Sequence, residues 1–185
     1  MGVSPNEGSG RRAVFLDRDG VLNRTMVREG KPYPPDSVAQ LEILPAVPKS
    51  LLDLRRAGFL LIVVTNQPDV GRGTQSRETI EAIHSRLREE LALDDIFVCY
   101  HADCDGCNCR KPAPGLLQQA AARYALDLPS CYMVGDRWRD VDAGHNAGCR
   151  SILIDYKYQE QTPEKEPIAL LGSLREAADW ILRFT

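Results

Sequence analysis

The stretch that decides the fold is AVFLDRDGVLN, residues 13–23. Its first four residues are apolar and predict a buried parallel strand, and Gly20 predicts the turn behind it. Carboxylates at positions i and i+2 of an extended backbone project to the same side, so Asp17 and Asp19 face the same way. They follow the carboxyl end of the strand, where open α/β sheets bind ligands. Two like charges this close favour a cation between them. The pattern therefore indicates a divalent metal and a carboxylate nucleophile, with a solvated Asp-Gly turn as the alternative.

Composition restricts the class of protein. The chain has 185 residues, 43% hydrophobic and 26% charged, as is ordinary for one globular domain. A net charge of −3 and a pI near 5.7 argue against a partner bound through bulk positive charge, such as nucleic acid or an anionic membrane. No apolar run approaches the roughly 20 residues that span a bilayer. We expect a cytoplasmic monomer, with a polar disordered leader over residues 1–10 and a single domain over residues 11–185.

Strand-like and helix-like segments alternate along the chain. A first helix opens at Pro45 or Pro48 and ends before Gly58. A second helix is predicted over 79–91, with Ser76 as its candidate N-cap. The remaining helices are predicted over 115–124, 140–147 and 173–182, and the strands over 13–16, 59–64, 96–99, 131–134 and 151–154. This order predicts an α/β fold: a three-layer, doubly wound parallel sheet with helices on both faces.

Each predicted strand is followed by polar residues suited to a phosphoryl group. Asp17 and Asp19 follow the first strand, residues 65–67 (Thr-Asn-Gln) the second, and residues 135–136 (Gly-Asp) the fourth. Because parallel strands end at one edge of a sheet, these groups are expected to meet there. Taken singly, Thr65 and its neighbours would be ordinary turn formers.

The same positions resemble the motifs of the haloacid dehalogenase superfamily of phosphohydrolases. The motifs D-x-D-G-[TV], a Thr after an apolar strand, a Lys before a helix, and G-D-x-x-x-D are matched by residues 17–21, Thr65, Lys111 and residues 135–140. The resemblance covers residues 13–154 and implies a Rossmann-like fold and phosphatase activity.

The resemblance also implies roles. Asp17 is the expected nucleophile, which forms an aspartyl-phosphate. Asp19 is the expected general acid and then general base. Thr65 and Lys111 are expected to hold the phosphoryl oxygens.

The expected cofactor is Mg²⁺, which prefers oxygen ligands. By the family pattern its ligands are the carboxylates of Asp17 and Asp136 and the backbone carbonyl of Asp19. Asp140 is expected to support this shell.

A cysteine-rich segment predicts a second metal site. Cys99, His101, Cys107 and Cys109 form two i, i+2 pairs, a Cys₃His set that suits tetrahedral zinc. Cys104 is a fifth candidate that spacing alone does not exclude, and free surface thiols are the alternative. A structural zinc in the loop over residues 99–109 would brace Lys111, which follows it.

This segment resembles the C-x-H…C-x-C-R-K-P signature of a superfamily branch with little or no cap domain. The branch includes D-glycero-D-manno-heptose 1,7-bisphosphate phosphatases and histidinol-phosphate phosphatases. The match assigns zinc to Cys99, His101, Cys107 and Cys109 and leaves Cys104 a bystander. The chain departs from the pattern at Tyr100, where Pro is usual, and at Arg137, where heptose enzymes carry Lys.

The expected substrate is a small phosphorylated sugar, with a heptose bisphosphate leading because residues 66–73 resemble those of the heptose enzymes. The residues expected to contact it are Asn23, Asn66, Gln67, Arg72, Arg110 and Arg137. The alternatives are a histidinol-phosphate phosphatase, a nucleic-acid end phosphatase, and a zinc-stabilised binding module without activity. The low pI counts against the nucleic-acid enzyme, and the presence of every catalytic motif residue counts against the inactive module.

Overall fold

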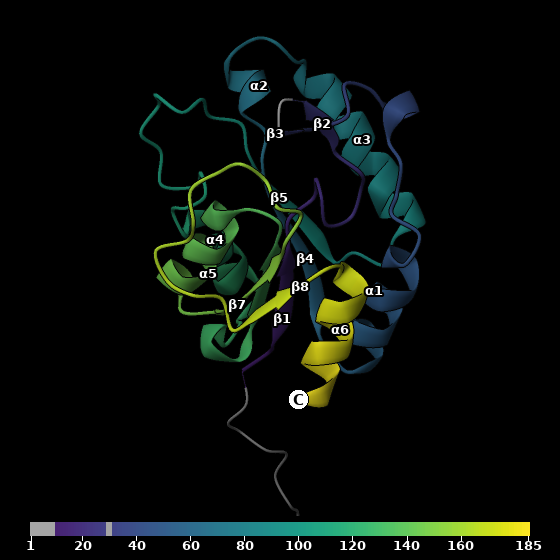
Figure 1. Cartoon of the computed structure of the whole chain (residues 1–185), viewed down its shortest axis with the longest axis vertical. Helices are drawn as coiled ribbons and strands as arrows, with labels where there is room; N and C mark the ends of the chain where they lie inside the picture. Colours follow the sequence, from purple (N-terminus) through teal and green to yellow (C-terminus); the bar gives the residue numbers. More distant parts are fainter. Residues whose placement is uncertain (1–9, 29–30) are drawn as a thin grey trace, which may run out of the picture.

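The computed structural model describes residues 10–28 and 31–185. The predicted leader, residues 1–10, lies outside the described residues except for Gly10, which is exposed. The centre of the molecule is a parallel sheet whose strands run in the order β5-β4-β1-β6-β7-β8 (Figure 1). The predicted doubly wound α/β fold is confirmed.

The sheet strands are β1 (Ala13–Leu16), β4 (Leu60–Asn66), β5 (Asp95–Cys99), β6 (Tyr132–Gly135), β7 (Arg150–Ile154) and β8 (Ala169–Leu171). The longer helices are α1 (Val47–Arg56), α3 (Arg77–Glu90), α4 (Gly115–Tyr124), α5 (Trp138–Ala147) and α6 (Leu174–Arg183). Short 3-10 turns lie at Val38–Gln40 and Leu128–Ser130. Ser76 caps α3 as predicted, since its side chain accepts from the amide of Thr79.

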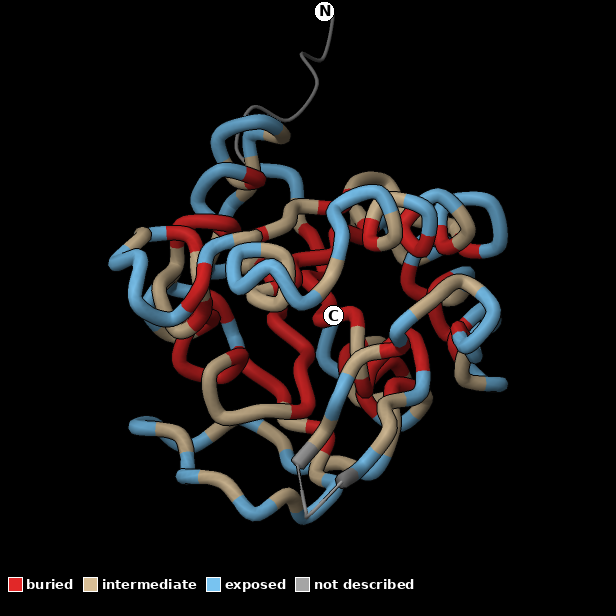
Figure 2. The backbone as a smooth tube through the Cα atoms, turned by 90° about the horizontal axis from the view of Figure 1, so that it is seen from above, coloured by how far each residue is buried: buried red, intermediate tan, exposed pale blue. Residues whose placement is uncertain are grey.

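Two hydrophobic cores lie on opposite faces of the sheet. One packs α1, α3 and α6 against residues such as Leu16 and Val63, and the other packs α4 and α5 against residues such as Phe15 and Ile62. Alternate residues of each strand therefore point to alternate cores, as a sheet covered on both faces requires. The buried backbone runs through the middle of the molecule beneath an exposed outer layer (Figure 2).

Three small elements were not anticipated from the sequence. A hairpin of β2 (Met26–Arg28) and β3 (Lys31–Tyr33) and the short helix α2 (Pro68–Gly71) lie above the carboxyl end of the sheet (Figure 1). The third is the edge strand β8, which extends the sheet beyond β7. Helix α5 also begins at Trp138, two residues before the predicted start at Asp140. In the part of the chain that the structure describes, no helix has the length and apolarity needed to cross a membrane.

Candidate active site

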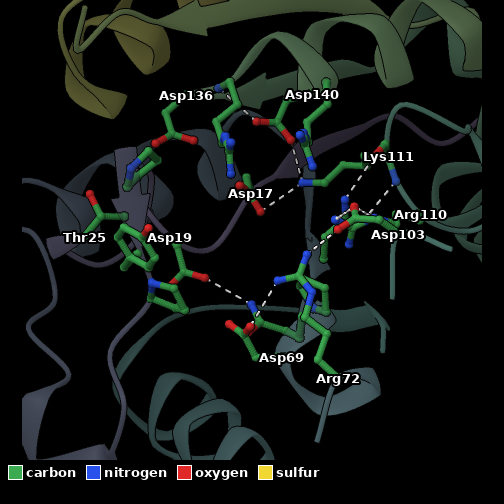
Figure 3. Close-up of a pocket in the computed structure, with 18 residues that line it drawn as sticks. Asp17, Asp19, Thr25, Asp69, Arg72, Asp103, Arg110, Lys111, Asp136 and Asp140 are labelled. Atoms are coloured by element: carbon green, nitrogen blue, oxygen red, sulfur yellow. Dashed lines mark hydrogen bonds and ion pairs between the residues drawn. The ribbon is translucent and has the colours of Figure 1, made fainter. Parts of the chain in front are cut away.

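A pocket of about 310 Å³ opens where β1, β4 and β6 end (Figure 3). Asp17 follows β1, Asn66 ends β4, and Asp136 follows β6, so three strand ends meet as the sequence predicts. Lys111 comes from the segment before α4 and points into the same pocket (Figure 3).

One end of the pocket is a buried cluster of carboxylates around Lys111. Its Nζ lies 2.9 Å from Asp17 Oδ1 and 2.6 Å from Asp140 Oδ1, and it also donates to the carbonyl of Val64 at 2.8 Å. Burial alone would lower the pKa of Lys111, but the charges of Asp140 and Asp17 outweigh it and raise the pKa. The lysine therefore stays charged and holds both carboxylates.

The carboxylates of this cluster carry more negative charge than Lys111 neutralises. Burial raises the pKa of Asp17 to about 6, and the charges of Asp140 and Asp19 act in the same direction, against the pull of Lys111. Burial and the charges of Asp17 and Asp140 raise the pKa of Asp136 well above 3.8. Within the described residues, neither carboxylate oxygen of Asp136 has a hydrogen-bond partner of good geometry.

This arrangement fits a divalent cation. Asp17, Asp136 and Asp140 each offer a carboxylate oxygen, and these oxygens lie within 4.8 Å of one another. Gly20 permits the close approach of the loop, because a Cβ there would lie 1.9 Å from Asp136 Oδ2, and its φ of +84° also favours glycine. Gly20, the glycine of the first motif, thus makes room for the carboxylate of Asp136.

Asp19 lies in the opposite electrostatic setting. Its carboxylate accepts hydrogen bonds from Arg18 Nη2 at 2.7 Å, Asn23 Nδ2 at 2.9 Å and Gln67 Nε2 at 3.0 Å. Burial would raise its pKa, but the charge of Arg18 and these hydrogen bonds lower it. Before substrate binds, Asp19 is therefore fully partnered and ionised, whereas Asp136 lacks well-placed donors.

Some residues predicted to contact substrate or phosphate hydrogen-bond other residues of the site in this structure. Asn23 is fully buried and donates to Asp19, so it holds Asp19, and its predicted contact with substrate stays a prediction. Asn66 lines the pocket, yet its side chain bonds both the amide and the carbonyl of Lys111 at 3.1 Å. Thr65 is buried at the end of β4, where its Oγ1 accepts from Gln67 Nε2 at 2.9 Å. Its predicted contact with a phosphoryl oxygen stays a prediction.

The other end of the pocket is rich in arginine. Arg72 and Arg110 both form ion pairs with Asp103, and Arg72 also pairs with Asp69 at 3.2 Å. Arg110 Nη1 is buried and has no hydrogen-bond partner among the described residues. The sequence did not single out Asp103, which lies between two predicted zinc ligands.

Arg139 adds a guanidinium group near Arg110, and Arg137 borders both ends of the pocket, since it also interacts electrostatically with Asp136 and Asp140. Arg137 pairs with Glu160, whereas Arg139 has no carboxylate within ion-pair distance in the described part of the chain. Burial and the positive charges of Arg137 and Arg110 lower the pKa of Arg139. Its Nε is buried without a hydrogen-bond partner, and its guanidinium lies 5.1 Å from the Trp138 ring centroid. Sequence reasoning missed Arg139, although it lies within the fourth motif, between two aspartates.

The cysteine cluster forms beside this end. Sγ and Nδ1 atoms lie 3.3–3.7 Å apart across Cys99, His101, Cys107 and Cys109. A tetrahedron with Zn–S bonds of about 2.3 Å has S···S edges of about 3.8 Å, so these four residues fit zinc. Cys104 is exposed and outside this group.

Comparisons with known proteins agree with this geometry. A family model described as HAD-hydrolase-like matches residues 108–177. A D-glycero-beta-D-manno-heptose-1,7-bisphosphate 7-phosphatase of Bordetella bronchiseptica is 36% identical over 148 residues, which cover 77% of this chain and 80% of the relative. The enzyme of the same name from Helicobacter pylori is 32% identical over 92% of this chain and 97% of its own length.

Solved structures give the same result. The crystal structure of D,D-heptose 1,7-bisphosphate phosphatase from B. bronchiseptica, complexed with magnesium and phosphate, superposes with a TM-score of 0.79. It is 31% identical, and the match covers 95% of this chain and 99% of that one. A putative HAD-like phosphatase from Mesorhizobium loti gives a TM-score of 0.74 at 30% identity, over 94% of this chain and 88% of its own. The chain therefore belongs to the heptose-1,7-bisphosphate 7-phosphatase family of the haloacid dehalogenase superfamily.

Proposed function

We propose that the chain is a Mg²⁺-dependent phosphatase that removes the 7-phosphate of D-glycero-D-manno-heptose 1,7-bisphosphate. Relatives with this name match most of the chain at 32–36% identity. The pocket has the matching chemistry: a nucleophilic carboxylate at one end and an excess of guanidinium groups at the other.

In this proposal Asp17 attacks the 7-phosphorus and forms an aspartyl-phosphate. When the negatively charged phosphate binds beside it, the Asp19 carboxylate takes up a proton from solvent, because a nearby like charge raises its pKa, and it passes this proton to the departing sugar oxygen. The carboxylate so regenerated then takes a proton from the water that hydrolyses the intermediate. Lys111 neutralises charge on the phosphoryl oxygens, as phosphoryl transfer requires, while Thr65 donates its hydroxyl to them.

The magnesium ion would be held by Asp17 and Asp136, with the backbone carbonyl of Asp19 completing the protein ligands and Asp140 supporting them. Bound there, it would supply positive charge to the transferring phosphoryl group. Asp136 supports this assignment: its carboxylate is buried, and among the described residues no donor, the nearby Tyr158 hydroxyl included, gives it a hydrogen bond of good geometry. A buried carboxylate is costly without a cation or a well-placed donor.

The observation that carries the substrate assignment is Arg139. Arg139 is half-buried, its Nε is buried without a hydrogen-bond partner, and it has no ion-pair partner among the described residues, so beside Arg110 and Arg137 it calls for an anion. The reacting phosphate occupies the Lys111 end, so this anion is a second phosphate on the same molecule. Arg72 lines the same wall.

Zinc on Cys99, His101, Cys107 and Cys109 would be structural, because four protein ligands leave no open position for chemistry. It would hold the loop that carries Asp103 and leads into Arg110. A monomeric state and a cytoplasmic location stay predictions.

Histidinol phosphate is the less favoured substrate. Its amine would need a free carboxylate, and the acidic groups at the arginine end, Asp69, Asp103 and Glu160, are already paired with arginines.

The test is phosphate release, with MgCl₂, from both anomers of heptose 1,7-bisphosphate, heptose 7-phosphate, histidinol phosphate and common sugar monophosphates. We expect the highest kcat/KM with a heptose bisphosphate. A preference for histidinol phosphate would overturn the substrate assignment. No turnover of any of these compounds would favour the inactive binding module.

A further inference from the structure

Arg18, the middle residue of the first motif, is fully buried beneath the pocket floor and does not line the pocket. A guanidinium has five N–H donors and is costly to bury unless they are satisfied. Here the guanidinium donates to other side chains of the protein, so Arg18 does not contact a substrate phosphate. Its contacts indicate what it does instead.

One side of the guanidinium grips Asp19. Arg18 Nε lies 3.1 Å from each oxygen of Asp19, and Nη2 lies 2.7 Å from Oδ2. The same Nη2 also donates to Gln67 Oε1 at 3.1 Å. Gln67 in turn donates to Asp19, so the three side chains close a ring. This fork fixes the plane of the carboxylate as well as its position.

The far side of the guanidinium is held by His84 on α3. Arg18 Nη1 lies 3.2 Å from His84 Nε2, and His84 is fully buried. Burial and the charge of Arg18 lower the pKa of His84 to about 4, so the imidazole is neutral near pH 7. A cationic Arg18 can only donate, so Nε2 accepts and the imidazole proton is on Nδ1.

We propose that Arg18 is a positioning residue for Asp19, and that His84 fixes Arg18 from behind. This inference rests on the proposed function, in which Asp19 is the acid and base. His84 thereby acts on proton transfer through one intervening side chain, without touching substrate or metal. Because His84 lies on α3, the packing of this helix against the sheet helps to fix the orientation of the Asp19 carboxylate.

This role predicts a dependence on the leaving group. A sugar alkoxide needs a proton as it departs, whereas p-nitrophenolate departs without one. A misplaced Asp19 should therefore lower kcat/KM for a sugar phosphate. It should leave kcat/KM for p-nitrophenyl phosphate nearly unchanged, because kcat/KM reports only the steps up to the first irreversible one, which is release of the leaving group. A loss of fold or of phosphate binding would lower both.

The experiment compares His84→Leu, which removes the acceptor but keeps bulk, with His84→Gln, whose Oε1 can take the place of Nε2. Ile83→Val, a buried core residue of the same helix, is the packing control. With MgCl₂, His84→Leu should lose about tenfold or more in kcat/KM for heptose bisphosphate and less than about threefold for p-nitrophenyl phosphate. His84→Gln should restore most of the loss, and Ile83→Val should show no difference between the substrates. The inhibition constant of inorganic phosphate should stay unchanged.

Equal losses with both substrates, or no rescue by Gln, would overturn the proposal. If His84→Leu does not fold, Arg18→Lys makes the same comparison, because a single ammonium cannot grip Asp19 and reach His84 together. Wild-type protein that hydrolyses neither substrate would contradict the proposed function itself, and that outcome is distinct from failure of the positioning role.

Discussion

The two ends of the pocket carry opposite charge imbalances. At the carboxylate end, Asp17, Asp136 and Asp140 share one cation, Lys111. At the arginine end, the guanidinium groups of Arg110, Arg137 and Arg139 outnumber the carboxylates that pair with them. The carboxylates are buried and the arginines are half-buried, so unpaired charge is costly at both ends and most costly among the carboxylates.

The difference between the two ends supports the proposed ligands. An excess of buried carboxylate is relieved by a cation, and an excess of guanidinium by an anion. Under the proposed function, a molecule with two phosphates would satisfy both ends at once, one phosphate at the metal and the other at the arginines. Variants that change one end at a time test whether the other end keeps its function.

The largest effect is expected from removing the nucleophile at the carboxylate end. Asp17→Asn should lower kcat at least about a thousandfold, because the amide cannot form the covalent intermediate. The control is Asp142→Asn, a buried carboxylate of α5 that accepts from the amide of Glu164 outside the pocket. Steady-state phosphate release measures both variants, and appreciable turnover by Asp17→Asn would contradict the role of the nucleophile.

A zinc-ligand variant should act on the arginine end, because the cysteine loop carries Asp103 and leads into Arg110. Cys109→Ser should lower zinc content from about one ion per chain and raise KM for the bisphosphate about tenfold, the value of one charge-assisted hydrogen bond. Cys104→Ser should change neither quantity, since Cys104 lies outside the cluster. Metal analysis and KM together check this, and full zinc content in Cys109→Ser would refute the ligand assignment.

Asp136→Asn should stabilise the protein when magnesium is left out. The pKa of Asp136 is raised above 3.8 on folding, so its ionised form favours the unfolded state at any pH above that value. The amide removes this penalty, so the variant should be the more stable protein at pH 7, and the advantage should vanish as the pH falls toward 3.8. Added MgCl₂ should stabilise wild type, by about 2.7 kcal/mol at a hundredfold excess over Kd, and should not stabilise the variant. Denaturant unfolding measures these differences, and a variant less stable than wild type without magnesium would contradict the account.

Much of the fold could be predicted because its strands are short apolar runs bounded by Gly, Thr or Asp. The strands Ala13–Leu16 and Leu60–Asn66 are covered on both faces of the sheet, so their own apolar sequence is enough to identify them. The edge strand β8 could not be predicted, because it has only three residues, Ala169–Leu171, and its place is set by pairing with β7. The hairpin of β2 and β3 is equally short and lies away from the core.

The residues of the site likewise fall into those that could be predicted from the sequence and those that could not. Asp17 and Asp136 could be predicted because strand ends meet at one edge whatever the loops do, and Lys111 because a Lys before a helix matches the third motif of the superfamily. Which side chains become braces depends on tertiary contacts with no local signal. Asn23 turns to Asp19 rather than to the pocket, and His84, an unremarkable helical residue in the sequence, lies buried behind Arg18.

The most direct test of the two-ended pocket is the ratio of kcat/KM for heptose 1,7-bisphosphate to that for heptose 7-phosphate. It should be measured in wild type, Arg139→Gln and Arg123→Gln, an exposed arginine of α4 as control. We expect Arg139→Gln to lower the ratio about tenfold or more while kcat/KM for the monophosphate stays near that of wild type, and Arg123→Gln to leave the ratio unchanged. An unchanged ratio in Arg139→Gln would contradict the assignment of the arginine end to a second phosphate.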